Sequence, residues 1–292
     1  MILSTHGVIA SQIQSFVGLL DTYPNAAAAY SVRKLRGAYT GNAIRVRRSS
    51  DNAETDIGFT LLGNLDTSAL TSFCSGTNGF VTTWYDQSGN GRNATQTTAA
   101  NQPQIVSSGS LILTNSKPSL RLNTGSTQFM NLQNVSLTNG ITNYNVLDPD
   151  VYLASEYWQF INISNGGTNG YGLSFSLHPS YDNRNIILGG VSLSNDSVAA
   201  NFNQQLLSGF YDGNGILSTD CSLSLNNVNL TLNDSQPWGA IQSQSYLAYF
   251  GAGGGSVNYF KGTIQEVVLY ASNQTSNNTG INTNINTYYA IY

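Results

Sequence analysis

The sequence predicts an all-β protein built as an antiparallel sandwich, with a few short helices. Segments in which apolar and polar residues alternate recur along most of the 292 residues, as in strands with one buried face and one wet face. Clusters of Gly, Asn, Ser and Asp, which favour tight turns, separate these segments. Because 40% of the residues are hydrophobic, the chain can bury a sizeable core.

The first 24 residues are predicted to form an arm before a single sandwich domain of residues 25–292. Apolar residues recur there at helical spacing, and DTYPN at 21–25 ends the pattern with turn formers and a proline. The stripe would pack on the sandwich or dock onto another subunit, and it consists of Ile9, Ile13, Phe16, Val17 and Leu20.

Alternation predicts strands at residues 43–48, 80–86, 119–123, 157–164, 172–177, 221–232 and 259–270. Helical patterns predict short helices at 26–35, closed by Gly37, at 67–74, capped by Asp66, and at 281–292. In the last helix, one face is expected to hold Ile281, Ile285, Tyr288 and Tyr292.

The composition excludes several classes of protein. Only 9% of the residues are charged and the net charge is -4, which gives no general reason to bind nucleic acid. No apolar run is long enough to span a membrane, and the N-terminus has no basic region typical of a secretory signal. Cys74 and Cys221 match no metal spacing and are expected to be buried free thiols.

The stretch FVTTWYDQSGNGRNATQ, residues 80–96, is predicted to be a strand that ends near Asp86, followed by a tight turn at Ser88–Gly91. In this interpretation Asp86 accepts hydrogen bonds from amides of its own loop. A calcium loop formed by Asp86, Asn90 and Asn93 is the alternative, because Ca²⁺ prefers carboxylate and amide oxygens. No other cofactor is expected.

Six of the eleven basic residues lie between Arg33 and Arg48. Arg45 and Arg47 share a face of a predicted strand, and structural ion pairs with the carboxylates that follow, Asp51 and Asp56 among them, are expected. Asp86 is a further structural carboxylate. Arg33, Lys34 and Arg36 form either a solvated helix face or a docking patch, and the sequence leaves this open.

Catalytic groups are scarce in the sequence. Glycosidases use two facing carboxyl groups, but the chain contains only Glu54, Glu156 and Glu266 besides its aspartates. Glu266 lies in a strand beside apolar residues, where a polar partner on a neighbouring strand is expected. With only His6 and His178, a Ser/His/Asp site has few places to form.

Residues 29–59 (AYSVRKLRGAYTGNAIRVRRSSDNAETDIGF) and 80–96 resemble the N-terminal part of the catalytic domain of family 54 α-L-arabinofuranosidases. Residues 209–232 and 260–272 resemble the closing strands of laminin-G-like or concanavalin-like domains. The resemblance implies a concanavalin-like jelly roll. It also places the family's general acid at Gly255 and its nucleophile in 172–185, which has no Glu, so it implies a scaffold without catalytic carboxylates.

The N-terminal arm, DTYPNAAAAYS at 21–31 and the Asn-rich end at 272–289 also resemble virion proteins of tailed bacteriophages. This resemblance implies a non-enzymatic decoration, head-fibre or tail-fibre protein on the virion surface, assembled in the host cytoplasm. Its partners would be other virion proteins, further copies of the chain and glycans of the host surface.

Sugar binding favours aromatic rings flanked by amides. The candidate rings are Trp84, Tyr85, Trp158, Tyr171, Tyr211 and Trp238. One alternative function is an arabinofuranosidase or another glycoside hydrolase, with acids drawn from Asp86, Glu156, Asp212 and Asp220. Another is a secreted bacterial adhesin that binds carbohydrate.

Overall fold

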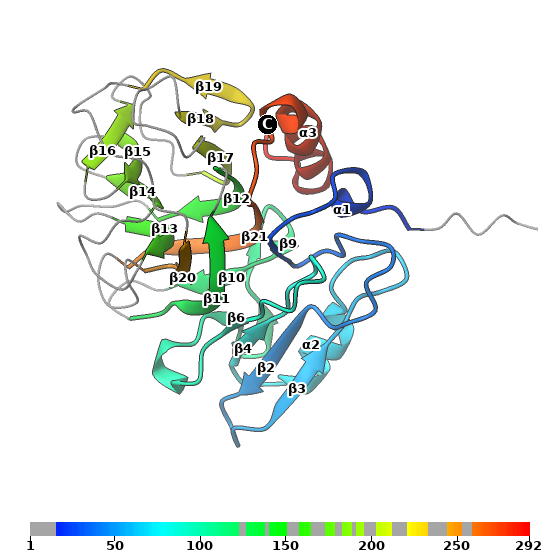
Figure 1. The fold of residues 1–292 in the computed structure, drawn as a ribbon. Helices are drawn as coiled ribbons and strands as arrows, with labels where there is room; N and C mark the ends of the chain where they lie inside the picture. The colour runs from blue at the N-terminus through cyan, green and yellow to red at the C-terminus, as the bar shows by residue number, and fades with distance from the viewer. Residues whose placement is uncertain are drawn as a thin grey trace, which may run out of the picture.

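The computed structural model describes residues 16–122, 127–137, 140–150, 158–164, 173–178, 183–188, 191–195, 203–211, 221–232, 244–252 and 259–292. Within these residues the chain is a β-sandwich with a few short helices (Figure 1), so the predicted fold class is confirmed. One hydrogen-bonded sheet connects 19 strands, and a separate hairpin contains the other two.

One group of antiparallel strands is centred on β12, which pairs with β17 on one side and β21 on the other. β17 continues through β18 to β19, while β1 and β10 pair with different parts of β21. The strands of this group are β1 (Ala28–Ser31), β10 (Leu120–Leu122), β12 (Ile141–Pro149), β17 (Gln205–Tyr211), β18 (Cys221–Leu225), β19 (Val228–Leu230) and β21 (Gly262–Tyr270).

A second group is centred on β20, which pairs with β11 and β13. β13 leads through β14 and β15 to β16, and β11 leads to β5. The strands of this group are β5 (Ala94–Thr95), β11 (Met130–Leu137), β13 (Trp158–Ser164), β14 (Leu173–His178), β15 (Asn183–Leu188), β16 (Val191–Asn195) and β20 (Gln244–Phe250).

β4 (Gly79–Trp84) connects the two groups, because it pairs with β5 at one end and with β6 at the other, and β6 pairs with β10. β2 and β3 extend the sheet beyond β4. The remaining strands are β2 (Ile44–Arg48), β3 (Glu54–Ile57), β6 (Gln104–Ser107), β7 (Ser110–Leu111) and the separate hairpin of β8 (Leu113–Thr114) and β9 (Lys117–Pro118).

The core is built from the inward face of each strand and contains a cluster of aromatic rings. Tyr30 of β1 and Trp84 of β4 both pack on Phe250 of β20, with ring centroids 4.9 Å and 6.0 Å from that ring. All three side chains are buried. Large rings from distant strands therefore supply much of the apolar burial that stabilises the sandwich.

The helices are α1 (Leu19–Thr22), α2 (Thr67–Phe73) and α3 (Asn278–Tyr289), with short 3-10 turns at Ala99–Asn101 and Thr275–Asn277. Asp66 caps α2 by accepting a hydrogen bond from the Ala69 amide. α3 lies beside α1 (Figure 1) and buries Ile281, Ile285 and Tyr289, whereas Tyr292 is half exposed. No helix in the described part of the chain is long and apolar enough to cross a membrane.

The helix predicted at 26–35 is wrong, because this segment contains β1. Ala28, Ala29, Tyr30 and Ser31 are all fully buried and pair with the end of β21. Alanine favours helices locally, but its small side chain also suits a strand packed on both faces, and burial overrides the local preference.

The predicted N-terminal arm lies partly outside the described residues, which begin after Ile9 and Ile13. Leu19 and Leu20 belong to the core, so the chain enters the sandwich before residue 24. Asp21 fixes this entry by accepting hydrogen bonds from the amides of Gly18 and Gly37. Docking of the arm onto another subunit stays a prediction.

Candidate functional site

Asp86 organises the loop after β4 from a buried position. One carboxylate oxygen accepts from the amides of Ala29 and Ser88, and the other accepts from the Ser88 hydroxyl and the Arg92 amide. These donors occupy both carboxylate oxygens, and the bond from the Ala29 amide holds the loop against β1. Asp86 therefore holds backbone in place and is unsuited to be a glycosidase acid.

The same contacts argue against the calcium alternative. Asn93 Oδ1 accepts from the Asp86 amide, and Asn90 Nδ2 donates to the carbonyls of Ala26 and Ala27. The loop thus presents N–H groups to its oxygens, where a cation would need free oxygens. Among the described residues no group of three or more His, Cys, Asp or Glu side chains could hold a metal ion.

The ion pairs around β2 lie at the surface. Arg45 Nε contacts Glu54 at 2.7 Å, and Arg45 Nη1 contacts Asp56 at 3.3 Å. Tyr85 donates to the same Asp56 carboxylate at 2.7 Å. Solvent screens half-exposed pairs of this kind, so they add little to the stability of a fold.

Two residues of the expected pairs have other partners. Asp51 pairs with Arg48, at 2.7 Å, and not with Arg47. Arg47 donates to Gln102 and Asn52, which are neutral amides. Hydrogen bonding to Arg48 lowers the pKa of Asp51 to about 2.

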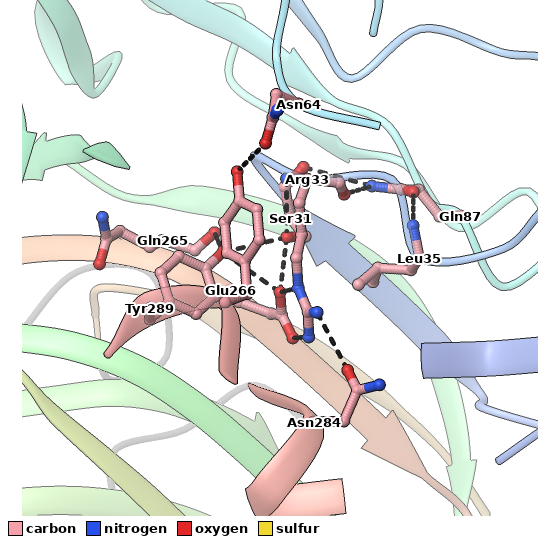
Figure 2. Close-up of polar contacts among 10 residues, drawn as sticks. Ser31, Arg33, Leu35, Asn64, Gln87, Gln265, Glu266, Asn284 and Tyr289 are labelled. Atoms are coloured by element: carbon pink, nitrogen blue, oxygen red, sulfur yellow. Dashed lines mark hydrogen bonds and ion pairs between the residues drawn. The ribbon is translucent and has the colours of Figure 1, made fainter. Parts of the chain in front are cut away.

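The strongest polar cluster is buried and is centred on Glu266 of β21 (Figure 2). Arg33 Nε and Nη2 donate to the two oxygens of Glu266 at 2.7 Å and 2.9 Å. Ser31 donates to the same carboxylate at 2.7 Å and Tyr289 at 3.2 Å, and Arg33 Nη1 donates to Asn284 at 3.0 Å. Burial disfavours the charged guanidinium, but attraction and hydrogen bonding to Glu266 outweigh burial and raise the pKa of Arg33.

This cluster joins β1, β21 and α3, three elements far apart in the sequence. Glu266 is fully buried and its oxygens already accept from Arg33, Ser31 and Tyr289. A carboxylate surrounded in this way cannot reach a substrate. We therefore assign the Arg33–Glu266 pair to stability and not to catalysis.

The structure describes the side chains of three of the six predicted sugar-binding rings. Trp84 and Tyr211 are buried in the core and present no face to a ligand, and Tyr85 is half-buried beside Asp56. Trp158 begins β13. The Trp158 side chain lies outside the described part of the chain, as do Tyr171 and Trp238.

A different set of residues forms a polar and aromatic face on the second group of strands. Asn131 of β11 lies in register with Thr95 of β5 and Tyr249 of β20, so the three side chains share one side of the sheet. Phe129 packs against Tyr249 and Tyr259, with centroids 6.3 Å from each ring. All five are at least partly exposed. We call these five residues the Tyr249 face; the sequence analysis did not predict it.

Among the carboxylates that the structure describes, Asp148 stands out by its raised pKa; the predicted acids Glu156, Asp212 and Asp220 lie outside the described residues. Asp148 is half-buried near the end of β12 and accepts no hydrogen bond from the described residues. Burial, followed by repulsion from Asp150, raises the pKa of Asp148, with Arg121 opposing. Arg121 binds Asp150 through two contacts of 2.7 Å and 2.6 Å. A carboxyl group with a raised pKa beside a paired carboxylate is a feature of acid–base sites.

Comparison with known proteins agrees with an arabinofuranosidase scaffold. The sequence profile of the catalytic domain of α-L-arabinofuranosidase B matches residues 21–121. The chain is 38% identical over 96 residues to α-L-arabinofuranosidase B of Aspergillus oryzae, covering 31% of this chain and 19% of that protein. It is 39% identical over 95 residues to the α-L-arabinofuranosidase of Hypocrea jecorina, again covering 31% and 19%. The chain thus matches about a fifth of the length of these relatives.

Solved structures extend the likeness to most of the fold. A family 54 α-L-arabinofuranosidase soaked with a cyclic sulfate inhibitor superposes with a TM-score of 0.63 at 19% identity, covering 89% of this chain and 62% of that one. An arabinofuranosidase complexed with arabinofuranosyl-α-1,2-xylobiose gives a TM-score of 0.63 at 20% identity and the same coverage. At this identity the likeness establishes the β-sandwich fold.

The expected role on a virion is wrong. The relatives and structures reported above are arabinofuranosidases, and none of these is a decoration, head-fibre or tail-fibre protein. The expected virion partners and virion-surface location are overturned with it. An Asn-rich end and an apolar N-terminal segment are compositional features, whereas the match over residues 21–121 depends on the residue at each position.

Proposed function

We propose that this chain is a glycoside hydrolase domain that cleaves α-L-arabinofuranosyl linkages. One observation carries the proposal: residues 21–121 match an arabinofuranosidase catalytic domain, and the fold likeness to such enzymes continues over 89% of the chain. A solved relative holds an arabinofuranosyl-xylobiose, which suggests the type of substrate. Because the chain spans only part of these relatives, activity and substrate are both proposed.

Asp148 is the proposed proton donor. The resemblance places the family's acid at Gly255, which has no carboxyl group, so we look to another residue for the proton. Asp148 is in register with Thr263 near the start of β21, the next strand after Gly255 in the sequence. Burial raises the pKa of this carboxyl group and so favours its protonated form, which can give a proton to the departing glycosidic oxygen.

Asp150 is the proposed carboxylate partner of Asp148. Residues two apart in an extended chain have Cα atoms roughly 6.5 Å apart and point to the same side. Glycosidase carboxyl groups are separated by about 5–9.5 Å, a range that two side chains two residues apart can reach, and Asp150 would then attack the sugar or activate a water. The bidentate contact with Arg121 fixes the orientation of Asp150.

The test is hydrolysis by the purified protein of 4-nitrophenyl α-L-arabinofuranoside and of an arabinofuranosyl-xylooligosaccharide. We expect Asp148→Asn to lower the rate on the oligosaccharide by about 10²–10⁴-fold, and to affect the nitrophenyl substrate less, because nitrophenolate leaves without a proton. The wild-type rate should fall as pH rises through the raised pKa of Asp148. Asp51→Asn, at an exposed pair, is the matched control.

Two results would count against the proposal. If the wild-type protein releases no arabinose from either substrate, the activity is absent. If it does so but Asp148→Asn hydrolyses the oligosaccharide at the wild-type rate, the activity stands and the assignment of the acid fails.

Arabinofuranosyl binding without hydrolysis is the second candidate. It is favoured by the resemblance, which places Gly255 at the family's acid position, and by the Tyr249 face, where amide and hydroxyl groups flank three rings. Retention on an arabinoxylan gel without release of arabinose would favour binding. Tyr249→Ala should then weaken retention, while Tyr39→Ala, which removes a half-buried ring elsewhere, should not.

A further inference from the structure

A cavity of about 290 Å³ opens where the N-terminal segment meets α3, apart from both Asp148 and the Tyr249 face. Phe16, Val17, Leu62 and Gly63 line it together with Asn284, Thr287 and Tyr288 of α3. Arg33 and Lys34 also line it. Ligand pockets have volumes of about 300–1,000 Å³, so this one has room for a ligand of monosaccharide size.

Positive charge gathers at this cavity. The Lys34 ammonium lies 5.6 Å from the centroid of the Phe16 ring, and the Lys117 ammonium lies 4.4 Å from that of Tyr288. Glu266 compensates Arg33, but within the described residues no carboxylate forms an ion pair with Lys34 or Lys117. An anion would therefore find an uncompensated ammonium at the cavity wall.

The other groups at the wall define the rest of the ligand. Asn284 Oδ1 accepts from Arg33 (Figure 2), which leaves the Nδ2 group of Asn284 as a donor. Phe16, Leu62 and the Tyr288 ring supply apolar surface. The C–H faces of a sugar ring pack well on such side chains, and its hydroxyls accept from an amide.

We propose that this cavity binds the carboxylate of a sugar acid, a uronic acid residue, with Lys34 holding the carboxylate. A free phosphate fits less well, because phosphate sites use several charged or backbone donors together. Here the amide of Gly18 is already bonded to Asp21, and the guanidinium of Arg33 to Glu266 and Asn284. The site does not depend on the proposed hydrolase activity.

Titration calorimetry of the full chain with D-galacturonate tests the proposal, with D-galactose and inorganic phosphate as comparison ligands. We expect galacturonate to bind at least about tenfold more tightly than either. Lys34→Met should weaken galacturonate binding by about tenfold to a hundredfold, because a hydrogen bond to a charged group is lost, and Lys34→Arg should largely retain it. Added salt should weaken binding.

Arg48→Met is the matched control, because it removes one exposed cation that pairs with Asp51 on another part of the surface. Circular dichroism of each variant verifies folding. Equal binding of galactose would overturn the role of the carboxylate, and equal binding of phosphate would overturn the sugar specificity. Unchanged affinity in a folded Lys34→Met variant would remove Lys34 from the site. Asp148→Asn should bind galacturonate like the wild type, so failure of the hydrolase proposal leaves this result unaffected.

Discussion

Replacing Glu266 by Gln tests whether the buried pair with Arg33 stabilises the fold. Glu266 has no exposed surface, and the Arg33 side chain is 9% exposed. The substitution keeps the shape but removes the charge, so it leaves a buried guanidinium without a counter-ion. Breaking a buried pair in this way costs about 3–5 kcal/mol. This is a large part of the 5–15 kcal/mol that is typical of a native protein.

The measurement is urea unfolding of three variants beside the wild type, with the free energy of unfolding extrapolated to water. Glu266→Gln should lose about 3–5 kcal/mol. Adding Arg33→Met to that variant removes the unpaired charge, so the double variant should be more stable than Glu266→Gln alone. Glu54→Gln, which breaks the half-exposed pair with Arg45, should cost much less than Glu266→Gln, because solvent screens this pair.

A loss below about 1 kcal/mol for Glu266→Gln would refute the reasoning, because it would mean that the unpaired Arg33 reaches water without cost. A double variant less stable than Glu266→Gln would refute it in another way. In that case the packing of the Arg33 methylene groups, and not the charge of Arg33, would stabilise the contact between β1, β21 and α3.

Further predictions concern Asp148, Gly262 and Trp84. Burial raises the pKa of Asp148, so its ionised carboxylate destabilises the fold, and this penalty vanishes below the ordinary pKa of 3.8. Thermal melts should therefore show that Asp148→Asn is more stable than the wild type at pH 7. At pH 3 the two proteins should be equally stable. Gly262→Ala should cost at least about 2 kcal/mol in urea unfolding, because φ is +147° and a Cβ would lie 2.3 Å from the Asp148 carbonyl oxygen. Gly76→Ala, at φ +68° with nothing within 4 Å, should cost less, and equal losses would contradict the steric argument. Trp84→Ala should cost about 3–5 kcal/mol by the same assay, and a loss under 1 kcal/mol would argue against a buried ring.

Several strands could be predicted from the sequence, because alternation and turn chemistry are local. The pattern AIRVRR gives β2, and CSLSLNNVNLTL gives the hairpin of β18 and β19. β1 could not be recognised, since its alanines favour a helix until the strand is buried beside β21. A strand packed on both faces loses the alternation that would reveal it.

The candidate site was less predictable than the fold. Asp86 stood out in the sequence as a lone carboxylate in a turn, yet its oxygens are used to hold backbone. Asp148 had no signal, because its raised pKa depends on burial at the end of β12 and on Asp150 and Arg121 nearby. A carboxylate becomes chemically distinct through its surroundings, which residue type does not reveal.

The sequence by itself determined that this protein is an antiparallel β-sandwich with a polar, weakly charged surface, because strand periodicity and turn residues act over a few positions. Only the tertiary structure decided which charges meet. Arg33 and Glu266 are 233 residues apart and become partners because β1 and β21 are neighbours in the sheet. The tertiary structure also decided that, among the described residues, Asp148 receives no hydrogen bond and Lys34 has no counter-ion. Pairing and burial depend on contacts between distant segments, and local patterns carry no information about them.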